Sequence, residues 1–131
     1  MIAVDTNVLV RFVVRDDARQ TCRARRLLER LQSEGGRAYV SDIVLCELVW
    51  VLERSYRVAR SEIADVLARL IRARPLTFDS TERIAGAIQS YGQGKGDFAD
   101  YLIREHAVAR DCDCVVTFDR QLLRESGFVA P

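Results

Sequence analysis

The sequence predicts an α/β fold with a mostly parallel central sheet of four to five short strands and helices on both faces. Short apolar runs that suit buried strands alternate with longer segments in which apolar residues recur at helical spacing. Strands that alternate with helices in this way favour a parallel sheet. The length of 131 residues is that of one ordinary domain. We therefore expect a single domain spanning residues 1–131.

In the first half of the chain the alternation begins at the N-terminus. Residues 2–4 form a short apolar run typical of a buried strand, and residues 8–14 are predicted to form a short helix. Asp16 and Asp17 are predicted to cap a longer helix, which ends at Gly35.

The next pair of elements is a strand over residues 37–40 and a helix over residues 42–54, with Ser41 as a helix cap. This helix is apolar on nearly every face, so we expect most of it to be buried. The amphipathic segment 61–73 is predicted to be a helix that serves packing alone.

The second half repeats the pattern. Two further strands are predicted at residues 75–78 and 115–118, and helices at residues 80–91, 97–110 and from 121 onward. Asp79 and Glu82 are spaced as in a capping box, so we assign Asp79 to structure.

Composition and charge favour a soluble globular protein. The chain is 49% hydrophobic and 30% charged, and its longest apolar run, residues 43–52, is too short to span a bilayer. The four cysteines follow no zinc or disulfide pattern, and we see no export signal, so we expect a cytoplasmic protein. The basic residues are nearly all arginine, with Lys95 the one lysine. Arginines on the helix that begins after Asp17 are consistent either with a solvated surface or with nucleic-acid contact.

Four acidic residues lie at comparable places in the predicted fold. Asp5 and Asp119 follow strands, Glu47 lies early in a helix that follows a strand, and Asp100 lies in the first turn of another helix. Ligands of open α/β sheets bind outside the carboxyl ends of the strands. We therefore expect these carboxylates to meet at one edge of the sheet.

Such a cluster requires a compensating charge. Two like charges about 4 Å apart repel by roughly 4 kcal/mol at an effective dielectric constant of 20. Because the four acids come without histidine or cysteine, the ligands are hard oxygens that favour Mg²⁺, with Mn²⁺ as a substitute. Structural interpretations remain open for each acid: Asp5 as a helix cap, Glu47 in an ion pair with an arginine, and Asp100 as an acid favoured at a helix start.

These residues carry a family resemblance over essentially the whole chain. The segments concerned are Val-Asp-Thr-Asn at 4–7, the lone Glu47 in an apolar helix, Asp-Phe-Ala-Asp-Tyr-Leu-Ile at 97–103 and Val-Thr-Phe-Asp at 116–119. In order and spacing they resemble the PIN-domain pattern, and most closely that of VapC toxins of bacterial toxin–antitoxin pairs.

The resemblance implies a PIN fold and a magnesium-dependent endoribonuclease that hydrolyses RNA phosphodiester bonds with a metal-activated water. It also implies a homodimer and inhibition by a VapB-type antitoxin. The family's acidic quartet corresponds to Asp5, Glu47, Asp100 and Asp119, and Asp97 is an additional acid suited to a second metal or a metal-bound water. Thr6, Asn7 and Thr117 match polar positions near the family's site. The alternative is a PIN domain that binds RNA or a protein partner without cleaving RNA.

Overall fold

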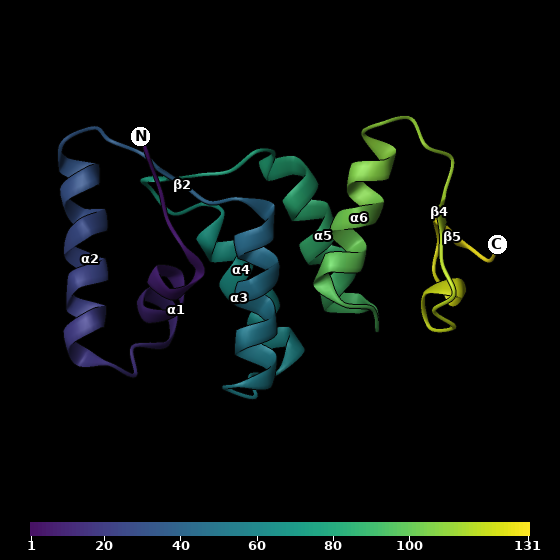
Figure 1. Cartoon of the computed structure of the whole chain (residues 1–131), viewed down its shortest axis with the longest axis horizontal. Coiled ribbons are helices and arrows are strands. Elements are labelled where there is room, and N and C mark those ends of the chain that lie inside the picture. The colour runs from purple at the N-terminus through teal and green to yellow at the C-terminus, as the bar shows by residue number, and fades with distance from the viewer. The chain divides into compact units, whose positions relative to one another are not determined.

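The computed structural model describes all 131 residues and divides them into two compact units. Unit 1 comprises Met1–Asp79 and unit 2 comprises Ser80–Pro131. Both contain helices and parallel strands (Figure 1). The predicted α/β class is confirmed, and all strand pairs are parallel as expected. That the whole chain acts as one domain stays a prediction.

Unit 1 contains a three-stranded sheet in the order β1-β2-β3. Its strands are β1 (Ile2–Ala3), β2 (Ala38–Tyr39) and β3 (Leu76–Thr77). The register sets Ile2 against Ala38 and Ala38 against Leu76. The predicted strands therefore lie in the correct places, but each is only two residues long. Strands this short contribute few ladder hydrogen bonds, so the packing of the helices has to supply most of the burial.

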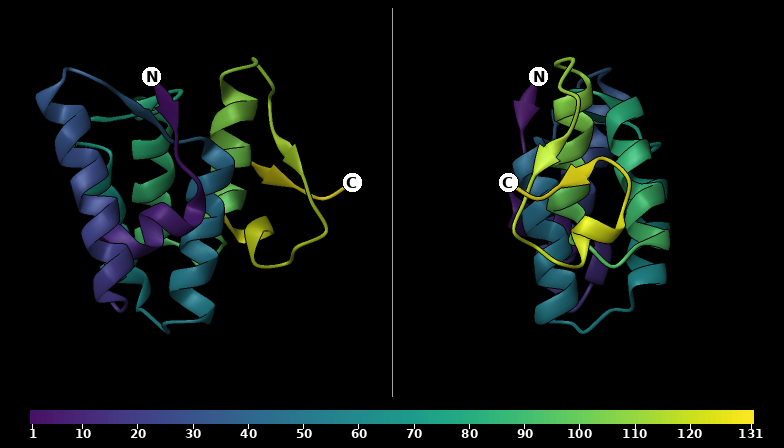
Figure 2. Two further views of the ribbon diagram at one scale, coloured as in Figure 1. Left: turned by 60° about the vertical axis from the view of Figure 1, so that its left-hand side comes forward. Right: turned by 90° about the vertical axis from the view of Figure 1, so that its right-hand side faces the viewer.

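Four helices complete unit 1: α1 (Thr6–Val14), α2 (Ala18–Ser33), α3 (Asp42–Arg54) and α4 (Arg60–Leu70). Helix α1 packs against both α2 and α3, as Figures 1 and 2 show. Leu9 of α1, Leu48 of α3 and Leu67 of α4 are completely buried and form part of the core. These three leucines occupy the apolar positions that the helical spacing predicts.

Two expectations about burial in unit 1 are wrong. Helix α3 is not buried on nearly every side, since Ile43 is 71% exposed and Glu47 is also exposed. Its buried residues lie on the other side, at Leu45, Leu48, Val49 and Leu52. Strand β1 is not a buried strand either, because it lies at the edge of its sheet and Ile2 is 40% exposed. A run of apolar letters does not distinguish a buried helix from one with a single buried side.

Unit 2 pairs two helices with a small sheet. Helices α5 (Thr81–Gln93) and α6 (Phe98–Val108) lie side by side. Strands β4 (Val115–Val116) and β5 (Phe128–Val129) are parallel, and the single-turn helix η1 (Leu122–Arg124) lies in the connection between them (Figure 2). The sequence predicts β4 but does not reveal β5. Tyr91 and Phe98 are buried in this unit and meet edge to face, with ring centroids 6.0 Å apart.

The start of α5 corrects a further expectation. Ser80, not Asp79, is the N-cap, and its hydroxyl accepts a hydrogen bond from the Arg83 backbone N–H. The Asp79 carboxylate instead accepts one from the Tyr39 hydroxyl at 2.8 Å. Asp79 still has a structural contact, but it fixes the end of β2 to the segment after β3.

None of the helices combines the length and the hydropathy that crossing a bilayer requires.

The environment of Cys46 predicts a difference in thiol reactivity. Burial, and to a lesser degree the charges of Asp42 and Glu47, raise the pKa of the Cys46 thiol to about 11. Alkylation requires the thiolate, whose fraction at pH 8 is then only about 0.1%. We expect iodoacetamide to modify the exposed Cys22 and Cys112 before Cys46. Peptide mass mapping over a time course measures the order, and early labelling of Cys46 in folded protein would contradict it.

Candidate active site

Asp5 occupies the turn between β1 and α1. Its backbone is extended, with φ −85° and ψ 162°, which is the usual N-cap conformation. However, its side chain makes no capping hydrogen bond, whereas Asp17 and Ser41 both accept one at the starts of α2 and α3. The interpretation of Asp5 as a helix cap is therefore not supported. The Asp5 side chain is exposed and remains available to a ligand.

Glu47 is held by a side chain next to Asp5. The buried Thr6 hydroxyl donates a hydrogen bond to Glu47 Oε2 at 2.5 Å, which joins α1 to α3. No arginine forms an ion pair with Glu47, so the interpretation of Glu47 as half of a structural ion pair is not supported. Thr6 thus orients the Glu47 carboxylate, and its supporting role in an active site stays a prediction.

At the start of α6 the two acids of the Asp-x-x-Asp segment interact through the backbone. The Asp97 backbone N–H donates a hydrogen bond to Asp100 Oδ2 at 2.9 Å. This bond is one half of a capping box, so Asp100 does help to begin its helix. It uses one carboxylate oxygen and leaves the other outside the bond. A structural role and a ligand role are therefore compatible for Asp100.

Asp119 is oriented in a similar way after β4. The Gln121 backbone N–H donates to Asp119 Oδ1 at 2.8 Å, and the Asp119 backbone N–H donates to Thr117 Oγ1 at 3.0 Å. Such bonds between a side chain and the nearby backbone fix an aspartate in a tight turn. Thr117 thus contacts the backbone of Asp119, and a supporting role for it in the site stays a prediction.

The acids of unit 2 are close enough to disturb one another. The pKa of Asp100 is raised, first because the side chain is partly buried and further because the charges of Asp97, Asp119 and Glu125 oppose its ionisation. Its hydrogen bond with the Asp97 backbone works in the opposite direction. Unit 2 therefore gathers three carboxylates whose charges oppose the ionisation of Asp100, an electrostatic condition that favours the binding of a cation.

Glu125 is a member of this group that the sequence does not reveal. Its Oε1 accepts hydrogen bonds from the Tyr101 hydroxyl at 2.8 Å and from the Lys95 backbone N–H at 3.1 Å. Tyr101 Oη in turn accepts one from the Gly96 backbone N–H at 2.9 Å. This network holds the loop that precedes Asp97. Glu125 follows η1 without any motif around it, so its pattern alone gave no reason to select it.

The structure thus brings the predicted residues together in two sets. Thr6 and Glu47 are in contact within unit 1, next to Asp5 in the chain, and Asp97, Asp100 and Asp119 lie close together within unit 2. Within neither unit do three or more histidine, cysteine, aspartate or glutamate side chains have the arrangement of a metal site. Convergence of both sets on one ion stays a prediction, as does a supporting role for the exposed Asn7.

The donor set nevertheless fits a hard divalent cation. The predicted ligands are all carboxylates, and two of them, Asp100 and Asp119, each have one oxygen oriented by a backbone N–H. Carboxylate oxygens are the ligands that Mg²⁺ and Mn²⁺ prefer.

Comparison with known proteins places this arrangement in a family. The family model of the PIN domain matches residues 2–127. The chain belongs to the PIN-domain family. The match includes both units and all five predicted acids, so the recognition made from the sequence is confirmed. Among curated proteins, the VapC ribonuclease of Aquifex aeolicus (strain VF5) is 27% identical over 128 residues, which cover 98% of this chain and 93% of that protein.

The crowding around Asp100 predicts an unusual mutational effect in this PIN domain. An acid whose pKa is raised by folding contributes most stability while protonated, and that contribution is lost as the pH rises through the raised pKa. Asn at position 100 removes the charge but keeps an oxygen for the Asp97 N–H. We expect Asp100→Asn to be at least as stable as the wild type at pH 7 in EDTA, with a flatter dependence of stability on pH above the ordinary aspartate pKa of about 4. Urea unfolding measures both, and strong destabilisation of the variant would show that the Asp100 charge supports the fold.

Proposed function

We propose that this PIN domain is a magnesium-dependent endoribonuclease of the VapC type that acts as the toxin of a toxin–antitoxin pair. Membership of the PIN-domain family and similarity to a protein named VapC ribonuclease support the nuclease class. The observation that carries the proposal is the group of carboxylates around Asp100, whose pKa is raised by partial burial first and also by the charges of Asp97, Asp119 and Glu125. Asp100 and Asp119 each keep one carboxylate oxygen outside their hydrogen bonds to the backbone, which suits a metal site.

In this proposal Asp5, Glu47, Asp100 and Asp119 hold Mg²⁺, which Mn²⁺ replaces, and Asp97 takes a second ion or a water. The ion that these carboxylates would hold would supply Lewis acidity, stabilising charge on the phosphoryl group and making water a better nucleophile for hydrolysis of the phosphodiester bond of RNA.

The surrounding residues have the task of presenting the carboxylates in fixed directions. Thr6 orients Glu47 by donating to Oε2, and the backbone N–H groups of Asp97 and Gln121 each occupy one oxygen of an aspartate. Side chains oriented before the ligand arrives lose less conformational freedom on binding. The remaining oxygens are the ones that we assign to the metal.

Glu47→Gln tests the catalytic assignment. Glutamine keeps an oxygen for the Thr6 hydroxyl and breaks no ion pair, so we expect a folded protein with at least the stability of the wild type in EDTA. RNA cleavage should fall about 100-fold or more, since loss of even an outer-shell partner costs roughly 10–100-fold in metal sites. Cleavage of a labelled RNA mixture in Mg²⁺ and in EDTA, followed by gel electrophoresis, measures the activity.

Glu62→Gln provides the matched control. Glu62 is an exposed glutamate on α4, and its substitution makes the same change in charge and size as Glu47→Gln. It should cleave RNA at the wild-type rate. Wild-type cleavage that continues in EDTA would contradict metal dependence. A wild-type protein that binds RNA but does not cleave it in either condition would favour the alternative of a non-catalytic PIN domain.

The proposed partner is a VapB-type antitoxin. A cluster of carboxylates attracts the planar fork of arginine, which engages a carboxylate through two hydrogen bonds. We expect the antitoxin to place a basic side chain among Asp5, Glu47, Asp100 and Asp119, so that high Mg²⁺ weakens the complex. Titration calorimetry across Mg²⁺ concentrations measures this competition. Full inhibition by an antitoxin without its C-terminal segment, at an affinity indifferent to Mg²⁺, would contradict it.

A further inference from the structure

A groove with a cavity volume of about 600 Å³ lies between α1 and α2 in unit 1. It is lined by nine residues: Asn7, Val8, Arg11, Gln20, Arg23, Ala24, Arg26, Leu27 and Arg30. Four of these are arginines and none is acidic or aromatic. The groove therefore combines an apolar floor with a purely positive rim.

The arginines of α2 are not used by the fold. Arg11 donates to Asp16 Oδ1 and to Gln20 Oε1, both at 2.6 Å, so its charge is already balanced. Arg23, Arg26 and Arg30 are exposed, and their side chains take part in no hydrogen bond or ion pair within the chain. These guanidinium groups are therefore available to an anionic ligand.

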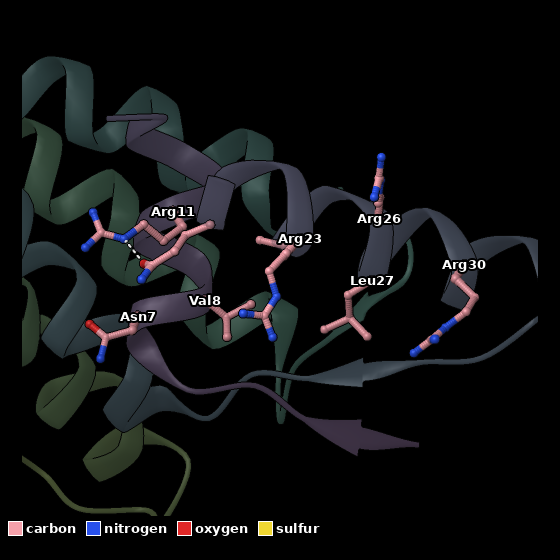
Figure 3. Close-up of a pocket in the computed structure, with 9 residues that line it drawn as sticks. Asn7, Val8, Arg11, Arg23, Arg26, Leu27 and Arg30 are labelled. Carbon is pink, nitrogen blue, oxygen red and sulfur yellow. Dashed lines mark hydrogen bonds between the residues drawn. The ribbon is translucent and has the colours of Figure 1, made fainter. Parts of the chain in front are cut away.

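Two of these arginines point the same way. Arg23 and Arg30 are seven residues apart, which places them within about 20° of each other around the helix and about 10.5 Å apart along its axis. Figure 3 shows both side chains on the side of Leu27, while Arg26 points to the opposite side. The same view shows Asn7 at one end of the row and Arg30 at the other. Asn7 lies two residues after Asp5.

We propose that this groove binds the sugar–phosphate backbone of single-stranded RNA, with Arg23 and Arg30 each contacting a phosphate. The guanidinium fork matches phosphate geometry, and phosphates repeat along a strand as the arginines repeat along α2. Recognition is of the backbone, because no aromatic side chain is present on which a base would stack. The inference rests on the proposed function, since it leads the strand past Asn7 toward Asp5.

An acidic protein segment would also complement the arginines, but RNA fits the surroundings better. Asn7, at one end of the groove, follows Asp5 by two residues, and Thr6 between them holds Glu47. These acids repel the carboxylates of a peptide and the phosphates of RNA alike in the absence of a cation. Only RNA carries a phosphodiester bond, which is the substrate of the proposed site.

The test compares two double variants that lose the same charge. R23Q/R30Q removes the two aligned arginines of the groove. R25Q/R74Q removes two exposed arginines that line a separate, smaller cavity also containing Glu29. Binding is measured by fluorescence anisotropy with two labelled single-stranded RNAs of unrelated sequence, each about 20 nucleotides and so longer than common site sizes. EDTA prevents cleavage, and the KCl concentration is varied.

Each phosphate contact contributes about 0.7 to the slope of log affinity against log salt for single strands. R23Q/R30Q should therefore lower that slope by about 1.4 and weaken binding roughly 25-fold at 0.1 M KCl, equally for both RNAs. R25Q/R74Q should bind as the wild type does. The single variants R23Q and R30Q should each give about half the change in log affinity, which keeps the test decisive if the double variant is unstable.

Equal weakening in both double variants, or wild-type affinity in R23Q/R30Q, would overturn the proposal. So would unchanged RNA affinity accompanied by lost binding of a labelled polyglutamate peptide, which would identify a protein-binding surface instead. Wild-type cleavage in Mg²⁺ is measured separately on the same RNAs. Arginine-dependent binding without cleavage would refute the proposed nuclease and leave this inference standing, whereas cleavage with normal binding by R23Q/R30Q would refute this inference alone.

Discussion

The shortness of the parallel strands is the constraint on which the arrangement of both units depends. Each strand has two residues, but single hydrogen bonds extend the ladders toward the acidic turns. Directly before Asp5, the Val4 N–H donates a hydrogen bond to the Tyr39 carbonyl oxygen at 3.0 Å. Shortly before Asp119, the Thr117 N–H donates one to the Val129 carbonyl oxygen at 2.9 Å. The connection to the next parallel strand leaves from the carboxyl end of each strand. The turn that follows a strand therefore lies at that edge of the sheet. The ladder thus fixes the backbone from which each acid projects.

The acids at these edges differ from the other polar residues at helix starts. Asp17, Ser41 and Ser80 all use their side chains to accept a backbone N–H, as propensity predicts. Asp5 has the same backbone conformation and makes no such bond. Asp100 does accept one, but its pKa is raised, so its charge is disfavoured in the folded state. Residues that break a local rule without a structural gain are where function is expected in a natural protein.

Much of this could be predicted from the sequence because periodicity reports which side of an element is buried. The order of helices and strands and the placing of Asp5 and Asp119 after strands follow from that periodicity. The prediction that α3 is buried on nearly every side was wrong. Apolar residues such as Ile43 also occur on exposed surfaces, so they do not reveal which side of a helix is covered. Strand β5 is short and its apolar residues lie near the chain end, so nothing in its pattern distinguished it from a loop.

Other features depend on contacts between residues far apart in the chain. Glu125 lies near Asp100 only because η1 returns the chain toward α6, and Tyr101 fixes it there. The sequence shows that Arg23 and Arg30 are spaced to lie on one side of a helix. Arginines on a solvated helix surface can have the same spacing. The groove beside Arg23 and Arg30 and the absence of acidic partners are the features that favour nucleic-acid contact over a solvated surface.

The net charge of +1 conceals a separation of charge within unit 1. Glu47 is held by the neutral Thr6 hydroxyl rather than by an arginine, and Arg23 and Arg30 have no acidic partner. Had the two sets paired with each other, each would have gained little, because exposed ion pairs contribute only about 0–1 kcal/mol. Both would also have lost their capacity to bind ligands. Keeping them apart costs the fold little stability, and it leaves the proposed metal ligand and the proposed phosphate contacts both available.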